Sequence, residues 1–235
     1  EIPAAFADRV AVPAANIVPL PDDMPEELGA LVEPMAVGYH AIRRGLPRPE
    51  DRVLVIGGGP IGQACLLAAR RLGVQALALS DVSQSRRNLC ARLGAEVIDP
   101  SAGDLPEAVA DRLGGPATLV ADAVGVNATV ADALAASDLG GRIVLVGMGT
   151  PQLELSAYAL STQERALIGS FTYSAAEFID TAEWVGTVPD GIDAMIDGRV
   201  GWEGAPQSFD DLARGRSAAS KILVFPHGPP ASTSA

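Results

Sequence analysis

The chain of 235 residues is long enough to bury a sizeable hydrophobic core, and its aromatic content of 4% favours tightly packed βαβ layers over an all-β sandwich. Its formal net charge of -12 argues against a nucleic-acid partner or an anionic membrane surface, because both attract basic proteins. The sequence contains no uninterrupted apolar run of about eighteen residues, and it does not begin with a secretory signal pattern. We therefore expect a soluble, cytoplasmic protein without a membrane partner.

Apolar periodicity predicts strands and helices that alternate from about residue 35 to residue 170, which is typical of a doubly wound parallel α/β sheet of the Rossmann type. Gly73, Gly94 and the pair Gly140-Gly141 fall where helices are expected to end. The elements expected in chain order are helix 35–44, strand 53–56, helix 61–72, strand 76–80, helix 83–93, strand 96–98, helix 105–113, strand 118–122, helix 127–137, strand 142–147, strand 166–170, helix 175–185, helix 209–213 and strand 221–225.

The most informative motif is a glycine turn that follows the expected strand 53–56, with the sequence Gly57-Gly58-Gly59-Pro60-Ile61-Gly62. Gly57 permits a tight turn, Gly59 lets the backbone approach a pyrophosphate, and Gly62 lets the following helix pack close to the strand. The helix that opens at Pro60 and Ile61 directs unpaired N–H groups and its positive dipole end at the phosphates. The motif therefore predicts a dinucleotide site.

An acidic residue, Asp81, follows a second apolar run roughly twenty residues after the turn, where a ribose-binding acid is expected. A carboxylate there accepts hydrogen bonds from the ribose hydroxyls and repels a 2′-phosphate, so NAD is favoured over NADP. Arg86 has three interpretations: it contacts the adenosine end, it attracts a 2′-phosphate and softens the preference for NAD, or it is a solvated arginine at a helix start.

The cysteines and histidines are few. Cys65 and Cys90 occupy apolar helix faces, and we expect neither a zinc site nor a disulfide from them. His40 is expected to be a packed residue on helix 35–44 rather than a proton carrier. His227 lies in the tail 226–235, whose composition indicates disorder.

Several further blocks occur in order along the chain. They are Val12–Asp22, Leu31-Val32-Glu33-Pro34 with the residues up to 41, Asp122-Ala123-Val124-Gly125, Gly140–Gly149 and Ile168-Gly169-Ser170-Phe171-Thr172-Tyr173. Together with the glycine turn, these blocks resemble the medium-chain dehydrogenase/reductase family, and within it the zinc-dependent alcohol and polyol dehydrogenases of the sorbitol dehydrogenase-like group.

The resemblance implies a GroES-like catalytic domain of which only remnants are present at both ends of this chain. It divides the sequence into the end of the first catalytic part at 1–34, an NAD-binding Rossmann domain at 35–170, a returning catalytic part at 171–225 and the tail at 226–235. The segment that in the family supplies a cysteine and a His-Glu pair as zinc ligands is missing from this sequence. Zinc is thus implied by resemblance, while most of its ligands are not here.

Glu33 is the one residue that the resemblance places near the metal, where it either binds zinc or hydrogen-bonds the zinc-bound water. From the sequence alone, an acid at this position equally complements the dipole of the helix that follows it. Both interpretations remain open at this stage.

The nicotinamide end of the cofactor is expected at the carboxyl ends of the fourth and fifth strands, because ligands bind at that edge of open α/β sheets. The residues expected there are Ala123, Val124, Val146, Gly147 and Met148. By resemblance, Ser170 and Phe171 join Val146 in holding the carboxamide.

The function expected from the resemblance is reversible hydride transfer between a secondary alcohol or its ketone and NAD, with zinc as the Lewis acid. Two alternatives remain: a truncated nucleotide-binding protein without catalysis, and a zinc-free member resembling quinone or enoyl reductases. The family also implies a homodimer or homotetramer, and the sequence does not choose between them.

Overall fold

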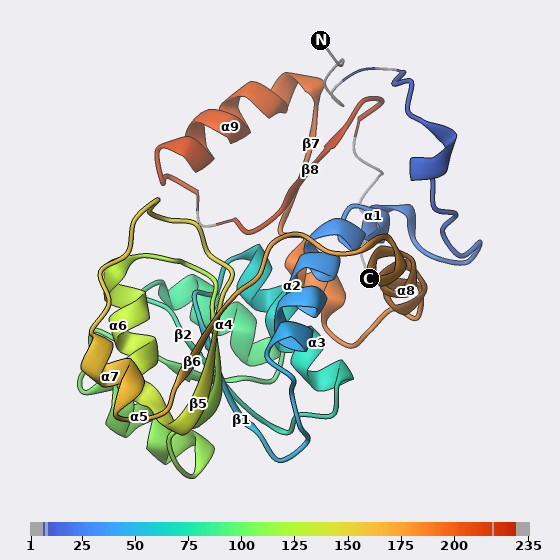
Figure 1. Cartoon of the computed structure of the whole chain (residues 1–235). Helices are drawn as coiled ribbons and strands as arrows, with labels where there is room; N and C mark the ends of the chain where they lie inside the picture. The colour runs from blue at the N-terminus through green and yellow to red at the C-terminus, as the bar shows by residue number, and fades with distance from the viewer. Residues whose placement is uncertain (1–6, 8, 218, 229–235) are drawn as a thin grey trace.

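The computed structural model describes residues 7, 9–217 and 219–228, and it is built on a six-stranded parallel sheet (Figure 1). The strands are β1 (Arg52–Ile56), β2 (Ala76–Ser80), β3 (Glu96–Ile98), β4 (Ala117–Asp122), β5 (Ser137–Leu145) and β6 (Ala166–Gly169). Their order across the sheet is β3-β2-β1-β4-β5-β6, so the chain runs outward from β1 in both directions. This is the doubly wound Rossmann arrangement that the alternating pattern predicts, and the predicted fold class is confirmed.

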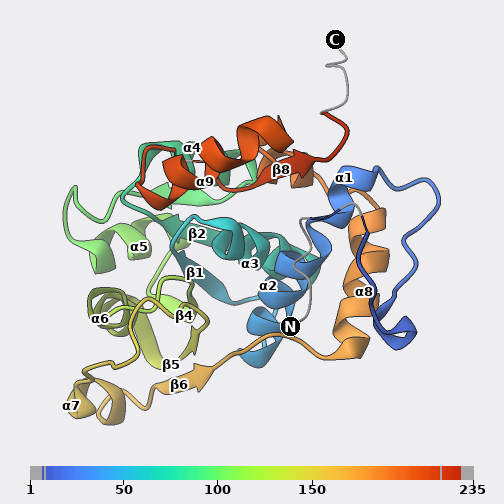
Figure 2. The same ribbon diagram turned by 90° about the horizontal axis from the view of Figure 1, so that it is seen from above.

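The central helices follow the strands in the predicted alternation. They are α2 (Val32–Arg44), α3 (Pro60–Arg71), α4 (Gln84–Arg92), α5 (Leu105–Leu113) and α6 (Asn127–Ala136). The alternation of side chains along β1 shows why two layers form: Val53 and Val55 join the core shared with α2 and α3, while Leu54 and Ile56 join the core shared with α5 and α6. Figure 2 shows these two helix pairs on opposite faces of the sheet.

Cys65 and Cys90, which are predicted to be buried, are completely buried, and both thiols are free. Burial raises the pKa of Cys65 to about 12. Burial, with the Asp81 carboxylate as a smaller cause, raises the pKa of Cys90 to about 12 as well. Both side chains are therefore neutral core residues at physiological pH, as their positions on apolar helix faces indicate.

The role expected for the pair Gly140-Gly141 is wrong. Gly140 and Gly141 were expected to end the helix after β4, but α6 ends at Ala136 and β5 begins at once with Ser137. The pairing of β4 with β5 is interrupted between Ala117 and Leu119, and Gly140 adopts a φ of 69° inside the strand. The two glycines thus allow an irregularity in β5 rather than a helix end.

The remaining elements frame the sheet at the two ends of the chain. They are the 3-10 helix Ala14–Asn16, α1 (Glu26–Gly29), α7 (Ala157–Ser161), α8 (Ala175–Gly186), the 3-10 helix Ile192–Met195, β7 (Gly198–Gly201), the 3-10 helix Trp202–Gly204, α9 (Ala205–Ala213) and β8 (Ile222–Phe225). Strands β7 and β8 form a separate two-stranded parallel sheet. The helix expected at 209–213 begins four residues earlier, at Ala205. Within the described residues, every helix is too short or too polar to cross a bilayer.

Helix α8 is held against α2 by a carboxylate, Glu177, whose side chain is 11% exposed. Its Oε2 lies 2.9 Å from Nδ1 of His40 and accepts hydrogen bonds from the N–H and hydroxyl of Ser174, both at 2.9 Å. Burial alone would raise the pKa of Glu177, but the hydrogen bonds from Ser174 and His40 outweigh it and lower the pKa below its ordinary value.

The Glu177→Gln variant is expected to have a free energy of unfolding about 1 kcal/mol lower than the native protein at neutral pH. The reason is that the capping box and the His40 contact lose the charged acceptor. A carboxyl group with a lowered pKa stabilises the fold above its unfolded pKa and loses that contribution as pH falls through the folded value. Urea denaturation at several pH values should therefore show the two proteins converging in acid. Glu183→Gln, an exposed position on the same helix, is the control. A difference that persists unchanged in acid would contradict this assignment.

Candidate functional site

The carboxyl ends of the central strands continue their backbone pairing into the loops that follow. Gly57 N–H donates to the Ser80 carbonyl at 2.8 Å, and Ala123 N–H donates to the Ile56 carbonyl at 2.9 Å. Val146 N–H reaches the Asp122 carbonyl at 3.0 Å in the same way. These bonds hold the ends of β1, β2, β4 and β5 in register, so the loops at this edge are fixed relative to one another.

The glycine turn between β1 and α3 is tightly packed at Gly57 and Gly62 and open at Gly59. Gly57 has a φ of 97°, and a Cβ built on Gly62 would lie 1.8 Å from the Gly57 carbonyl oxygen. A Cβ built on Gly59 would meet no atom within 4 Å. Pro60 occupies the first turn of α3, where its missing N–H costs no helix hydrogen bond, and Ile61 follows it. The open side of the turn therefore faces space in front of a helix N-terminus.

Asp81 lies at the end of β2 and is 7% exposed. Its Oδ2 accepts a hydrogen bond from Gly58 N–H at 2.6 Å, and its Oδ1 accepts one from Ser83 N–H at 2.7 Å. Nη1 of Arg86 lies 3.8 Å from Oδ2. The acid that the sequence places roughly twenty residues beyond the glycine turn is thus bonded directly to that turn.

A cavity of about 400 Å³ opens at this edge, between the turn, the end of β2 and the start of α6. It brings together four residues predicted for the site: Gly57, Asp81, Arg86 and Val124. The other lining residues are Ile56, Ser80, Val82, Pro100, Ser101, Ala128, Thr129 and Asp132. The arrangement offers backbone N–H groups, two carboxylates and a guanidinium around a largely apolar slot, and dinucleotide sites are built in this way.

Residues 60–187 match the sequence profile of the family described as zinc-binding dehydrogenase. The chain belongs to the zinc-binding dehydrogenase family. The sorbitol dehydrogenase of Arabidopsis thaliana is 35% identical over 175 residues, which cover 72% of this chain and 48% of that enzyme. The chain thus spans about half the length of the curated relatives it matches.

Solved structures of dehydrogenases share the fold. The L-idonate 5-dehydrogenase of Escherichia coli superposes with a TM-score of 0.82 at 26% identity, covering 91% of this chain and 61% of that one. A zinc-binding dehydrogenase from Sinorhizobium meliloti, solved with NADP bound, superposes with a TM-score of 0.78 at 29% identity, covering 88% of this chain and 61% of that one. This likeness confirms the predicted family resemblance.

The other predicted dehydrogenase-site residues lie along the same edge, outside this cavity. Ala123 follows β4, and a Cβ on Gly147 would clash with the Val124 backbone at 2.2 Å, so the two loops touch. The side chains of Met148 and Phe171 are exposed, at 79% and 71% respectively. Ser170 N–H donates to the Leu145 carbonyl at 3.0 Å, whereas its buried hydroxyl has no hydrogen-bond partner within the described part of the chain.

Glu33 is exposed and lies in the first turn of α2, where its charge complements the helix dipole. Burial, with the Glu33 charge as the smaller cause, raises the pKa of Tyr173. In the part of the chain that the structure describes, no three His, Cys, Asp or Glu side chains gather so as to hold a metal ion. The described residues therefore do not form a zinc site by themselves.

Two acidic residues at this edge, Asp122 and Asp132, were not predicted as site residues from the sequence. Asp122 is completely buried, and its Oδ1 accepts hydrogen bonds from the N–H groups of Val124 and Gly125 at 2.9 and 3.0 Å. Its Oδ2 accepts one from the Thr129 hydroxyl at 2.9 Å. Asp132 follows Thr129 by three residues on α6, and both line the cavity. The i, i+3 spacing of Thr129 and Asp132, on a helix whose other residues after Asn127 are apolar, was the signal available for Asp132.

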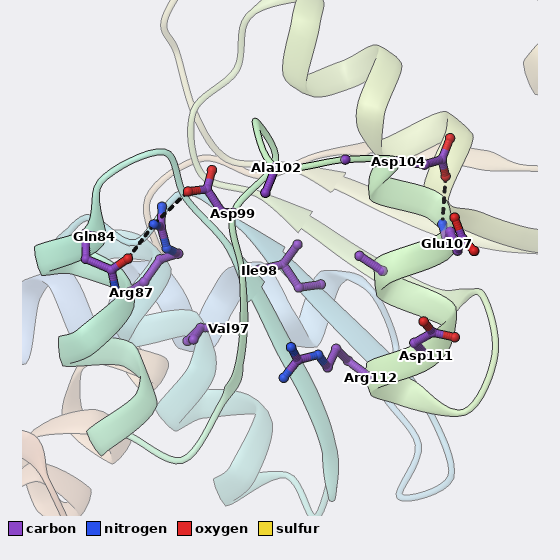
Figure 3. A pocket seen from close by; sticks show the side chains of 12 residues that line it. Gln84, Arg87, Val97, Ile98, Asp99, Ala102, Asp104, Glu107, Asp111 and Arg112 are labelled. Carbon is purple, nitrogen blue, oxygen red and sulfur yellow. Dashed lines mark hydrogen bonds and ion pairs between the residues drawn. The ribbon is translucent and has the colours of Figure 1, made fainter.

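A larger cavity, of about 570 Å³, lies between α4 and α5 on the outer side of β3 (Figure 3). The guanidinium of Arg87 lies between Gln84 and Asp99 and bonds both at 2.7 Å. Asp104 accepts the N–H of Glu107 at 2.8 Å and caps α5. These polar side chains serve the local fold, and the cavity contains neither the glycine turn nor Asp81.

Proposed function

We propose that this chain is the cofactor-binding part of an NAD-dependent oxidoreductase that transfers hydride between a secondary alcohol, such as a polyol, and its ketone. The observation that carries the proposal is the direct hydrogen bond from Gly58 N–H to Asp81, which joins the phosphate-binding turn to the ribose-binding acid at the mouth of one cavity. Family membership supports the reaction class, since the relatives matched are polyol and sugar-acid dehydrogenases.

The residues fit a dinucleotide in a defined order along the sheet edge. The open side of Gly59 and the α3 N-terminus at Pro60 and Ile61 would receive the pyrophosphate, while Asp81 would bind the ribose hydroxyls. Arg86 would flank the adenosine end. The bound nicotinamide supplies the hydride acceptor, and the protein supplies its position.

The nicotinamide end would lie further along the edge, near the loops after β4, β5 and β6. Ala123, Val124, Val146, Gly147 and Met148 would bound the ring. Ser170 and Phe171 complete this group, and the unpaired, buried Ser170 hydroxyl supports a polar contact there.

The domain division proposed from the resemblance places the cofactor domain at 35–170, with 1–34 and 171–225 belonging to a catalytic domain. The separate β7–β8 sheet supports this division, because it shares no strand with the main sheet. Zinc ligands would have to come from residues other than those described. A homodimer or homotetramer is proposed as the assembly.

The Gly59→Ala variant tests the cofactor proposal. Its added Cβ meets no protein atom within 4 Å, so the urea midpoint should stay within error of the native value. If a pyrophosphate occupies that space, NADH affinity measured by fluorescence titration should fall about tenfold or more. Unchanged NADH affinity, or no NADH binding by the native protein, would contradict the proposal. NADH binding without turnover of any polyol, measured on a protein that includes the zinc-ligand segment, would instead favour a nucleotide-binding protein without catalysis.

A further inference from the structure

Asp132 is an acidic side chain that makes no hydrogen bond or ion pair with the described residues. It lies on α6 beside Ala128 and Thr129 and lines the 400 Å³ cavity that also contains Asp81. It is half-buried, and within the described residues its carboxylate has no hydrogen-bond or ion-pair partner. The other acids at this edge, Asp81 and Asp122, have both oxygens engaged by N–H or hydroxyl groups.

The surroundings of Asp132 are unfavourable to its charge in the protein without ligand. Burial, followed by repulsion from the nearby Asp122 carboxylate, raises its pKa above the ordinary value. No protein donor contacts this half-buried carboxylate, so an N–H group of a ligand in the cavity would stabilise its charge. Such a group at the wall of a ligand cavity indicates a contact completed by the ligand.

The chemistry of the cavity around Asp132 suits one part of a dinucleotide. Val82, which is 75% exposed, and the side chains of Pro100 and Ala128 offer apolar surface for a flat ring. Asp81 and Arg86 occupy the side near the glycine turn, where the ribose and phosphates would lie. The base therefore falls on the α6 side, and the hydrogen-bond donors on its edge would face an acceptor.

We propose that Asp132 is a specificity-determining residue that accepts a hydrogen bond from the exocyclic amino group of a bound adenine, and so selects adenine dinucleotides over 6-oxopurine dinucleotides. The proposal rests on the proposed function, because it needs a dinucleotide in the cavity. Adenine presents an N–H donor at position 6, whereas hypoxanthine presents a carbonyl oxygen there that a carboxylate repels. The consequence is selectivity by the base, separate from the selectivity that Asp81 gives at the ribose.

The test compares the dissociation constants of NAD and nicotinamide hypoxanthine dinucleotide by isothermal titration calorimetry. The native protein is expected to bind NAD about tenfold more tightly than the hypoxanthine analogue. The Asp132→Asn variant keeps the shape of the side chain and adds an amide donor for the 6-oxo group, so the preference should vanish or invert. Asp111→Asn, on the exposed face of α5 and outside this cavity, removes the same charge and should leave the preference intact.

The outcomes separate the two proposals. If the native protein and Asp132→Asn bind both dinucleotides with the same ratio, the role of Asp132 is overturned while NAD binding stands. If Asp111→Asn changes the ratio as strongly as Asp132→Asn, the effect is one of overall charge and the proposal is also overturned. If NAD does not bind to the native protein and Gly59→Ala therefore changes nothing, the proposed function itself fails.

Discussion

Replacing Gly62 by alanine is expected to lower the free energy of unfolding by about 3 kcal/mol. The added Cβ would lie 1.8 Å from the Gly57 carbonyl oxygen and 2.9 Å from its carbon, both backbone atoms of the turn itself. Relief requires α3 to move away from β1, and α3 is buried along most of its length. The loss of stability therefore comes from disturbed core packing as well as from the strained turn.

Urea denaturation followed by far-ultraviolet circular dichroism measures this loss as a lower midpoint with an unchanged slope. Gly103→Ala is the matched control, because a Cβ there meets no atom within 4 Å and its backbone is not left-handed. Equal midpoints for Gly62→Ala and Gly103→Ala would show that the turn opens at little cost, and would remove the steric reason for a glycine at position 62.

The local signals of the sequence predict the central sheet well. Strands β2 and β3 and helix α5 have the predicted bounds, because their ends are marked by chemistry that acts within a few residues. Asp104 caps α5 by accepting Glu107 N–H, and Gly114 ends it in a left-handed conformation. Such ends can be predicted from the sequence because the residues that cause them are adjacent to them.

Helices and strands whose formation depends on residues far away in the sequence are not predicted. The short helices α1 and α7 and the strand β7 are each four or five residues long, too short to show a period. Strand β7 exists only through its pairing with β8, in which Gly198 lies opposite Ile222. The early start of β5 has the same origin, since Ser137 pairs with Ala117 although two glycines follow it.

In the candidate site too, residues in local motifs are predicted, whereas a residue placed by tertiary structure is not. Gly57 and Asp81 are predicted from spacing, and the structure joins them through Gly58. Asp132 belongs to no strand end or motif, and its place in the cavity depends on how α6 crosses the sheet. What the sequence conveys is the backbone framework of a nucleotide site, whereas the side chains that tune it from a neighbouring helix need the tertiary structure.

The Asp81→Asn variant is expected to raise the affinity for NADPH relative to NADH by about tenfold. The native carboxylate repels a 2′-phosphate, and it also lies 3.8 Å from Nη1 of Arg86, whose charge it partly neutralises. Asparagine removes the repulsion and leaves the guanidinium available to the phosphate. Fluorescence titrations of both reduced cofactors measure the ratio directly.

The double variant Asp81→Asn with Arg86→Ala separates the two causes. If Arg86 supplies the attraction, most of the gain in NADPH affinity should disappear in the double variant. Asparagine has a single acceptor oxygen for the Gly58 and Ser83 N–H groups, so a loss of about 1 kcal/mol in unfolding free energy should accompany the change. An NADPH to NADH ratio unchanged from the native protein, together with that loss of stability, would mean that Asp81 only holds the glycine turn. Any preference for NAD would then have to come from another part of the cavity.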